Sequence, residues 1–196
     1  MATISHLQYD RVMTAPDTLS LASRLCLACG MCCDGTVHAF ARIQAADVEP
    51  AQAAGFAPYD TPDGLPAFPR PCRYLDGAAC RRYMDWRPSI CGDYFCKLQK
   101  RVATDECAED EAFQLIANAL SARKQVQAVL PSCTTLEHAR KRYSELASSR
   151  QALAPEDARL VTRLFMLERL LDLHFRQASL VPLPTFPADS GPTSAQ

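Results

Sequence analysis

The chain has 196 residues and nearly balanced charges, with 21 basic and 22 acidic side chains and a formal net charge of −1. Because this balance produces no overall field, we expect neither nucleic acid nor an anionic membrane as a partner. No stretch approaches the roughly 18 uninterrupted apolar residues of a membrane-spanning helix, so we expect no membrane span. The 48% of hydrophobic residues is enough for the core of one or two small domains.

The first segment, residues 1–18, is polar, and we expect it to be flexible. It lacks the basic start and the apolar run of a secretion signal, which predicts a cytoplasmic location. After it, Leu19, Ala22 and Leu25 share one helical face and predict a short helix that leads into a group of cysteines.

This first group places four cysteines within eight residues in the pattern C-x2-C-x2-C-C, and they are Cys26, Cys29, Cys32 and Cys33. Thiolates spaced by two residues can surround one metal centre, as they do in zinc sites and iron–sulfur clusters. The side chains of the adjacent pair diverge from neighbouring α-carbons. We therefore expect Cys32 and Cys33 to serve two centres, or one of them to bind metal while the other packs.

The segment between the two cysteine groups predicts little regular structure. Residues 36–40 are too few to assign a strand, and Asp47 is a candidate N-cap of a short helix that ends at Gly55. Residues 55–71 contain five prolines and two glycines, which predicts a long irregular loop. Such a loop needs another source of order, and metal coordination is the source we expect.

A second group of four cysteines lies within residues 72–96, and its members are Cys72, Cys80, Cys91 and Cys96. Disulfides are the alternative to metal, but they belong mainly to secreted proteins, whereas in a reducing compartment such spacing favours metal binding. We therefore predict that all eight cysteines of the two groups bind metal. The remaining two, Cys107 and Cys133, are expected to pack as small hydrophobic residues.

Basic residues accompany the second cysteine group. Residues 70–101 contain eight of them, against three aspartates: Arg70, Arg73, Arg81, Arg82, Arg87, Lys97, Lys100 and Arg101. Four thiolates on one zinc ion leave a formal charge of −2, and nearby cations would offset this charge and lower the pKa of each thiol. A nucleic-acid-binding face is the alternative, which we disfavour because the basic residues lack interleaved exposed aromatic residues.

Residues 106–181 predict a helical extension with about three helices. The first spans 108–130, the second follows a capping box at Thr134–Glu137, and the third begins near Pro155. An apolar stripe runs along the third helix through Leu160, Leu164, Leu167, Leu171 and Phe175. This stripe predicts packing either within the chain or between the C-terminal helices of a homodimer.

The order and spacing of the cysteine motifs resemble those of one family. The cysteine box is followed by Pro71-Cys72-Arg73-Tyr74-Leu75-Asp76-Gly77, then by Cys80-Arg-Arg-Tyr83, Arg87-Pro88 and Tyr94-Phe95-Cys96. Together they resemble the YkgJ-like zinc- or iron-chelating CxxCxxCC family over residues 22–100. The resemblance implies zinc or iron–sulfur binding and similarity to a domain of flagellin lysine methylases. It assigns no general reaction and does not extend to residues 106–196.

The spacing also bears on the metal. The pattern C-x2-C-x2-C matches the start of the bacterial ferredoxin motif, whose fourth ligand comes from elsewhere in the chain. Zinc sites more often use two C-x2-C pairs, and the second cysteine group supplies no such pair. We therefore favour an iron–sulfur cluster on Cys26, Cys29, Cys32 and a remote cysteine, with zinc as the alternative.

These patterns predict a mainly α fold with long irregular loops. A small metal-organised, cysteine-rich domain is expected over 20–105, followed by the helical extension over 106–181 and a flexible tail at 182–196. The leading hypothesis is iron–sulfur binding with electron transfer or an accessory role to a partner enzyme. A zinc-stabilised structural or interaction module is the second hypothesis. The third, a subunit acting in protein modification, rests on the resemblance alone.

Overall fold

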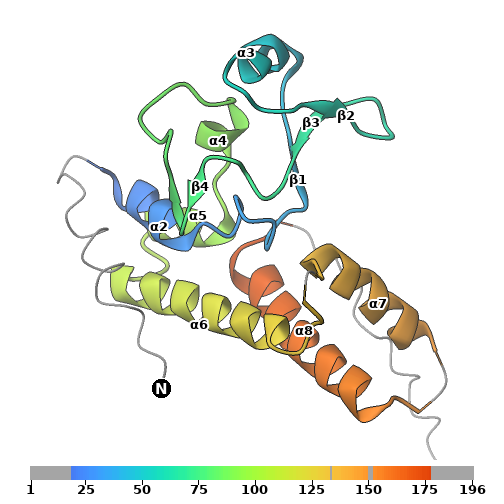
Figure 1. The fold of residues 1–196 in the computed structure, drawn as a ribbon. Coiled ribbons are helices and arrows are strands. Elements are labelled where there is room, and N and C mark those ends of the chain that lie inside the picture. Colours follow the sequence, from blue (N-terminus) through green and yellow to red (C-terminus); the bar gives the residue numbers. More distant parts are fainter. Residues whose placement is uncertain (1–18, 133, 150–151, 178–196) are drawn as a thin grey trace, which may run out of the picture.

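The computed structural model describes residues 19–132, 134–149 and 152–177 (Figure 1). Its helices are α2 Leu21–Cys29, α3 Val48–Ala53, α4 Ile90–Asp93, α5 Lys97–Ala103, α6 Glu109–Gln127, α7 Leu136–Ser148 and α8 Pro155–His174, with a 3-10 turn at Ala45–Asp47 before α3. Its strands are β1 Phe40–Arg42, β2 Tyr59–Asp60, β3 Pro66–Pro69, β4 Leu75–Asp76 and β5 Ala79–Cys80. The described fold is thus mainly α with short strands and irregular connections, as predicted. The segments predicted to be flexible, 1–18 and 182–196, lie outside the described residues.

The three helices predicted for the extension are α6, α7 and α8, and α6 and α8 run side by side in Figure 1. Pro155 occupies the first turn of α8, followed by Glu156 and Asp157, whose charges complement the positive end of the helix. The N-cap of α7 is Thr135, whose hydroxyl accepts a hydrogen bond from the backbone N–H of His138 at 3.3 Å. The predicted N-cap was therefore placed one residue too early, and His138 rather than Glu137 lies three residues after the cap.

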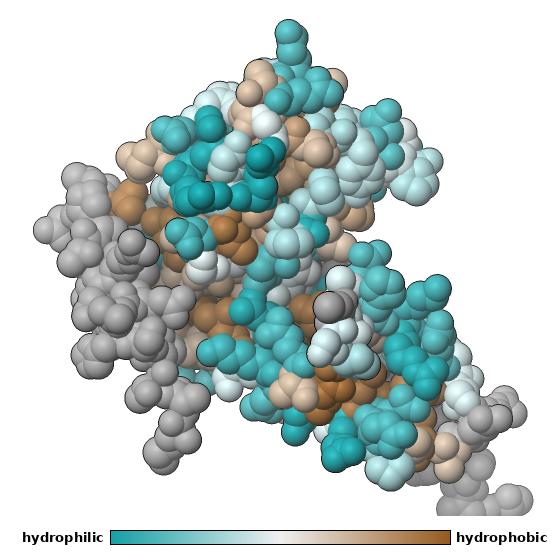
Figure 2. All heavy atoms as spheres, in the orientation of Figure 1, coloured by the Kyte–Doolittle hydropathy of each residue, from teal (hydrophilic) through white to brown (hydrophobic). Residues whose placement is uncertain are grey.

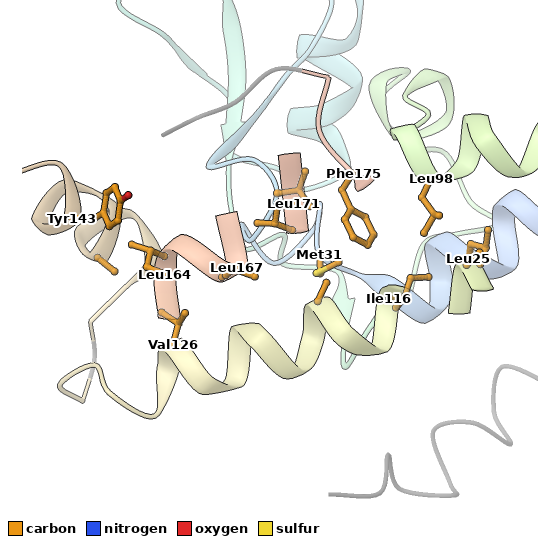
Figure 3. Packing of buried hydrophobic residues seen from close by; sticks show 14 of the residues in the cluster. Leu25, Met31, Leu98, Ile116, Val126, Tyr143, Leu164, Leu167, Leu171 and Phe175 are labelled. Atoms are coloured by element: carbon orange, nitrogen blue, oxygen red, sulfur yellow. The ribbon is translucent and has the colours of Figure 1, made fainter. Parts of the chain in front are cut away.

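The larger hydrophobic core joins the extension to the first cysteine group (Figure 3). Leu164, Leu167 and Leu171 of the α8 stripe are fully buried in it. They pack in one cluster with Leu25, Met31, Val37, Leu98, Ile116, Val126 and Phe175, which come from α2, the loop after it, α5, α6 and the end of α8. The stripe therefore packs within the chain, which was one of its two predicted arrangements.

A smaller core lies under a three-stranded antiparallel sheet in the order β1-β3-β2. Phe68 of β3 is 2% exposed, and its ring centroid lies 5.0 Å from that of Phe56. This sheet corrects the prediction of a wholly irregular loop over 55–71, because β2 and β3 lie inside that range. The prolines misled the prediction: Pro66 and Pro69 occupy the two ends of β3, where a missing N–H is tolerated best.

Asp47 occupies the N-cap position of α3, as predicted, but its side chain makes no cap hydrogen bond to that helix. Its Oδ2 instead accepts hydrogen bonds from the backbone N–H of Ser89 at 2.9 Å and from the Ser89 hydroxyl at 2.6 Å. Asp47 thereby links the start of α3 to the residue that precedes α4, the helix that carries Cys91.

Candidate metal centre

The first cysteine group lies on α2 and the turn that follows it. The hydroxyl of Ser20 caps α2 by accepting a hydrogen bond from the N–H of Ser23 at 3.2 Å. Gly30 ends the helix in the left-handed conformation, with φ of 63°. A Cβ on Gly30 would lie 2.7 Å from the carbonyl oxygen of Ala78, so glycine permits the end of α2 to approach the β4–β5 hairpin closely.

Backbone hydrogen bonds join the two cysteine groups directly. The carbonyl oxygen of Cys33 accepts a hydrogen bond from the N–H of Cys72 at 2.7 Å. The carbonyl oxygen of Cys72 accepts one from the N–H of Leu75 at 3.0 Å, and Leu75 pairs with Cys80 across the β4–β5 hairpin. Cys33 and Cys72, which are 39 residues apart in sequence, are therefore held beside each other by backbone hydrogen bonding.

Cys96 is brought to α2 by a glutamine. Cys96 is the N-cap of α5, and its backbone N–H donates a hydrogen bond to Oε1 of Gln99 at 3.0 Å. The Nε2 of the same Gln99 donates to the carbonyl oxygen of Ala22 in α2 at 3.0 Å. Gln99 thus ties the start of α5 to the helix that carries Cys26 and Cys29. Sequence analysis overlooked Gln99, although its position three residues after the cap fits a capping box.

A cavity of about 30 Å³ lies where these elements meet. Five cysteines line it, and they are Cys26, Cys29, Cys32, Cys33 and Cys96. The rest of its wall is largely apolar and includes Leu25, Met31, Leu98, Ile116 and Phe175, which Figure 3 shows converging between α2, α5, α6 and the end of α8. The visible face in Figure 2 has hydrophobic residues in the region of α2, β4 and α5, bordered by hydrophilic ones.

Burial and mutual repulsion disfavour the charged form of these thiols. Burial raises the pKa of Cys26 to about 12, with further increases from the charges of Cys33 and Cys96. Burial likewise raises the pKa of Cys91 to about 11. The pKa of Cys32 also rises, through burial and then through the charges of Cys29 and Cys96. Several thiolates can therefore coexist here only when positive charge compensates them.

Guanidinium groups supply part of that positive charge. Arg70 and Arg87 lower the pKa of both Cys33 and Cys91, in opposition to the larger effect of burial. The Nε and Nη1 atoms of Arg70 are buried and have no hydrogen-bond partner among the described residues. The Arg70 guanidinium also stacks over the ring of Phe68, 4.7 Å from its centroid. Because these donors are unpaired and lie near thiols, they are available to stabilise negative charge on the sulfur atoms.

The cysteines lie close together but do not form a complete metal-binding site. Every cysteine in the described part of the chain is a free thiol. Among those same residues, no three His, Cys, Asp or Glu side chains converge in positions that would hold one metal ion. The donor set nevertheless fits a soft metal, because partly buried thiols near the unpaired guanidinium nitrogens of Arg70 are suitable ligands for zinc or iron.

Two cysteines, Cys107 and Cys133, belong to neither cysteine group. Cys107 is buried in the larger core, in the connection between α5 and α6. Its thiol lies 3.6 Å from the carbonyl oxygen of Ala108. Cys133 lies outside the described residues. The predicted packing role of Cys107 as a small hydrophobic residue is confirmed.

Comparison with known proteins adds no relative: no family model, no curated protein and no solved structure matches this chain. The resemblance to the CxxCxxCC family therefore rests on the motifs quoted above. None of the helices over the described ranges is long and apolar enough to cross a membrane.

Proposed function

We propose that this chain binds an iron–sulfur cluster through its grouped cysteines and serves an electron-transfer or accessory role to a partner enzyme. The observation that carries the proposal is the gathering of both cysteine groups around the end of α2, as free thiols in partly buried positions. In a folded chain, such a concentration of soft ligands is most simply explained by a soft metal.

The surroundings support a role for the chain in holding such a centre. The apolar side chains of Leu25, Met31 and Phe175 line the cavity and would exclude water from the thiolates. Arg70 and Arg87 would offset negative charge on Cys33 and Cys91. A bound cluster would supply one-electron chemistry: it would take one electron from a reduced redox protein and pass it to the partner enzyme.

The position of Cys96 fits the ligand set expected for an iron–sulfur cluster. The C-x2-C-x2-C pattern supplies three ligands and requires a fourth from elsewhere. Cys96 lines the same cavity as Cys26, Cys29 and Cys32 and comes from a separate helix, α5, which it caps. It is therefore a suitable fourth ligand.

A zinc-stabilised interaction module is the second candidate, and the shortness of the elements over residues 38–96 favours it. The strands there have two to four residues, and the longest helix, α3, has six. Elements this short contribute little independent stability, so a bound structural metal would stabilise the folded state of this region.

The deciding experiment is anaerobic purification followed by absorbance spectroscopy and analysis of iron, acid-labile sulfide and zinc per chain. Brown protein with iron and sulfide in equal amounts supports the cluster. Colourless protein with bound zinc supports the interaction module instead. Cys107→Ser is the matched control and should keep the full metal content, while Cys29→Ser should lose metal. Protein that contains no bound metal under these conditions, and takes up none on reconstitution, would overturn both candidates.

A further inference from the structure

We propose that the eight cysteines form two separate metal centres, one on Cys26, Cys29, Cys32 and Cys96 and the other on Cys33, Cys72, Cys80 and Cys91. This inference rests on the proposed metal-binding function and assigns each thiol to a centre. The two sets are called the α2–α5 set and the hairpin set below.

The α2–α5 set belongs to the larger core. Cys29, Cys32 and Cys96 pack against that core, and all four members of the set line the cavity between α2 and α5. The double hydrogen bond of Gln99, to the N–H of Cys96 and to the carbonyl oxygen of Ala22, fixes the distance between the two helices. The four thiols therefore already line one cavity between α2 and α5, and they would have to converge further to bind one ion.

The hairpin set belongs to the smaller core. Cys72 and Cys91 pack against it, next to Tyr74 and Ile90. Cys80 lies opposite Leu75 in the β4–β5 hairpin, and Leu75 donates its backbone N–H to the carbonyl oxygen of Cys72. The hairpin thus holds Cys72 and Cys80 near each other, beside a core that the α2–α5 set does not enter.

Cys33 marks the boundary between the two centres. It lines the cavity, but its carbonyl oxygen accepts the hydrogen bond from the N–H of Cys72 at 2.7 Å. Its neighbour Cys32 packs against the larger core. Cys32 thus packs against the larger core, while the backbone of Cys33 is bonded to Cys72, which packs against the smaller one.

Arginines supply counter-charges beside the cysteines. Arg70 and Arg87 both act on Cys33 and on Cys91, and Arg87 also acts on Cys26 of the α2–α5 set. Four thiolates on one divalent ion carry a formal charge of −2, which such guanidinium groups offset in part. The buried Nε and Nη1 of Arg70, which are unpaired among the described residues, are donors still free to face such a centre.

The test is an anaerobic titration of the reduced, metal-free, full-length chain with Co²⁺, whose thiolate charge-transfer absorbance reports each bound ion. We expect two ions per wild-type chain and two per Cys107→Ser control. A double substitution within one set, C26S/C29S or C72S/C91S, should leave one ion bound at the wild-type affinity. A double substitution across the sets, C29S/C72S, should leave no site at that affinity.

Two results would overturn the assignment while leaving metal binding intact. One is a single ion per wild-type chain, which requires no variant to fold. The other is equal binding by the within-set and across-set variants. Failure of the wild-type chain to bind any Co²⁺ would instead overturn the proposed function itself.

Discussion

The Nε of Arg176, just beyond the end of α8, donates a hydrogen bond to the carbonyl oxygen of Val37 at 2.9 Å. Arg176 is fully buried, and its other donors reach the carbonyl oxygen of Thr36 and the carboxylate of Glu168. Arg140 of α7 binds the same Thr36 carbonyl oxygen at 2.6 Å and the same Glu168 at 3.0 Å. The helical extension therefore holds the backbone that directly follows the first cysteine group.

The first prediction concerns the carboxylate at the centre of this network. Glu168→Ala would leave two buried guanidinium groups without their shared anion, so we expect the free energy of unfolding to fall by about 3–5 kcal/mol. Urea denaturation followed by circular dichroism measures this change. The control is Glu145→Ala, because Glu145 is exposed and its ion pair with Arg142 spans 3.9 Å. A loss below about 1 kcal/mol, as expected for a surface pair, would contradict the prediction.

This network also shows which contacts could not be predicted from the sequence. Periodic apolar residues and Pro155 predicted α6, α7 and α8, because helical periodicity is a local signal. The hydrogen bond from Arg176 to Val37 spans 139 residues, and no local pattern reports such a contact. The hydrogen bonds of the Asp47 side chain could not be predicted for the same reason, since Ser89 lies 42 residues away. Cysteine spacing identified the candidate ligands, whereas the proposed division into two sets depends on tertiary packing.

The second prediction concerns the α8 stripe. Leu164 is fully buried against α6 and α7, so Leu164→Ala should lower the free energy of unfolding by about 2–5 kcal/mol through lost burial and a residual cavity. Met166 on the same helix is 56% exposed, and Met166→Ala serves as the control with little expected effect. Chemical denaturation and size-exclusion chromatography should be measured together. Unchanged stability with a halved molecular mass would show that the stripe forms an interface between chains instead.

The third prediction concerns metal removal. The smaller core holds few residues, and its strands β1, β2 and β3 have at most four residues each. Removing metal by chelation under reducing, anaerobic conditions should therefore expose residues 55–71 to protease faster than α6. Limited proteolysis of the metal-loaded and metal-free protein, with the cleavage sites identified by mass spectrometry, provides the measurement. Equal cleavage of 55–71 in both forms would mean that metal does not order this segment.

The fourth prediction separates close packing from backbone strain at the end of α2. Gly30 and Gly64 both have positive φ, of 63° and 74°, so alanine at either position should cost about 1–2 kcal/mol in backbone strain. Only at Gly30 would the new Cβ meet another atom, the carbonyl oxygen of Ala78 at 2.7 Å, whereas nothing lies within 4 Å at Gly64. Gly30→Ala should therefore lower stability more than Gly64→Ala.

Gly30→Ala should also lower metal content, because the approach of α2 to the β4–β5 hairpin brings the two cysteine groups together. Thermal unfolding of the two variants, with metal analysis of the same samples, tests both parts of this prediction. Gly64→Ala should keep the wild-type metal content despite its strain, since the turn between β2 and β3 carries no cysteine. Equal stability losses with full metal content in both variants would show that the contact with Ala78 is unimportant for assembling the site.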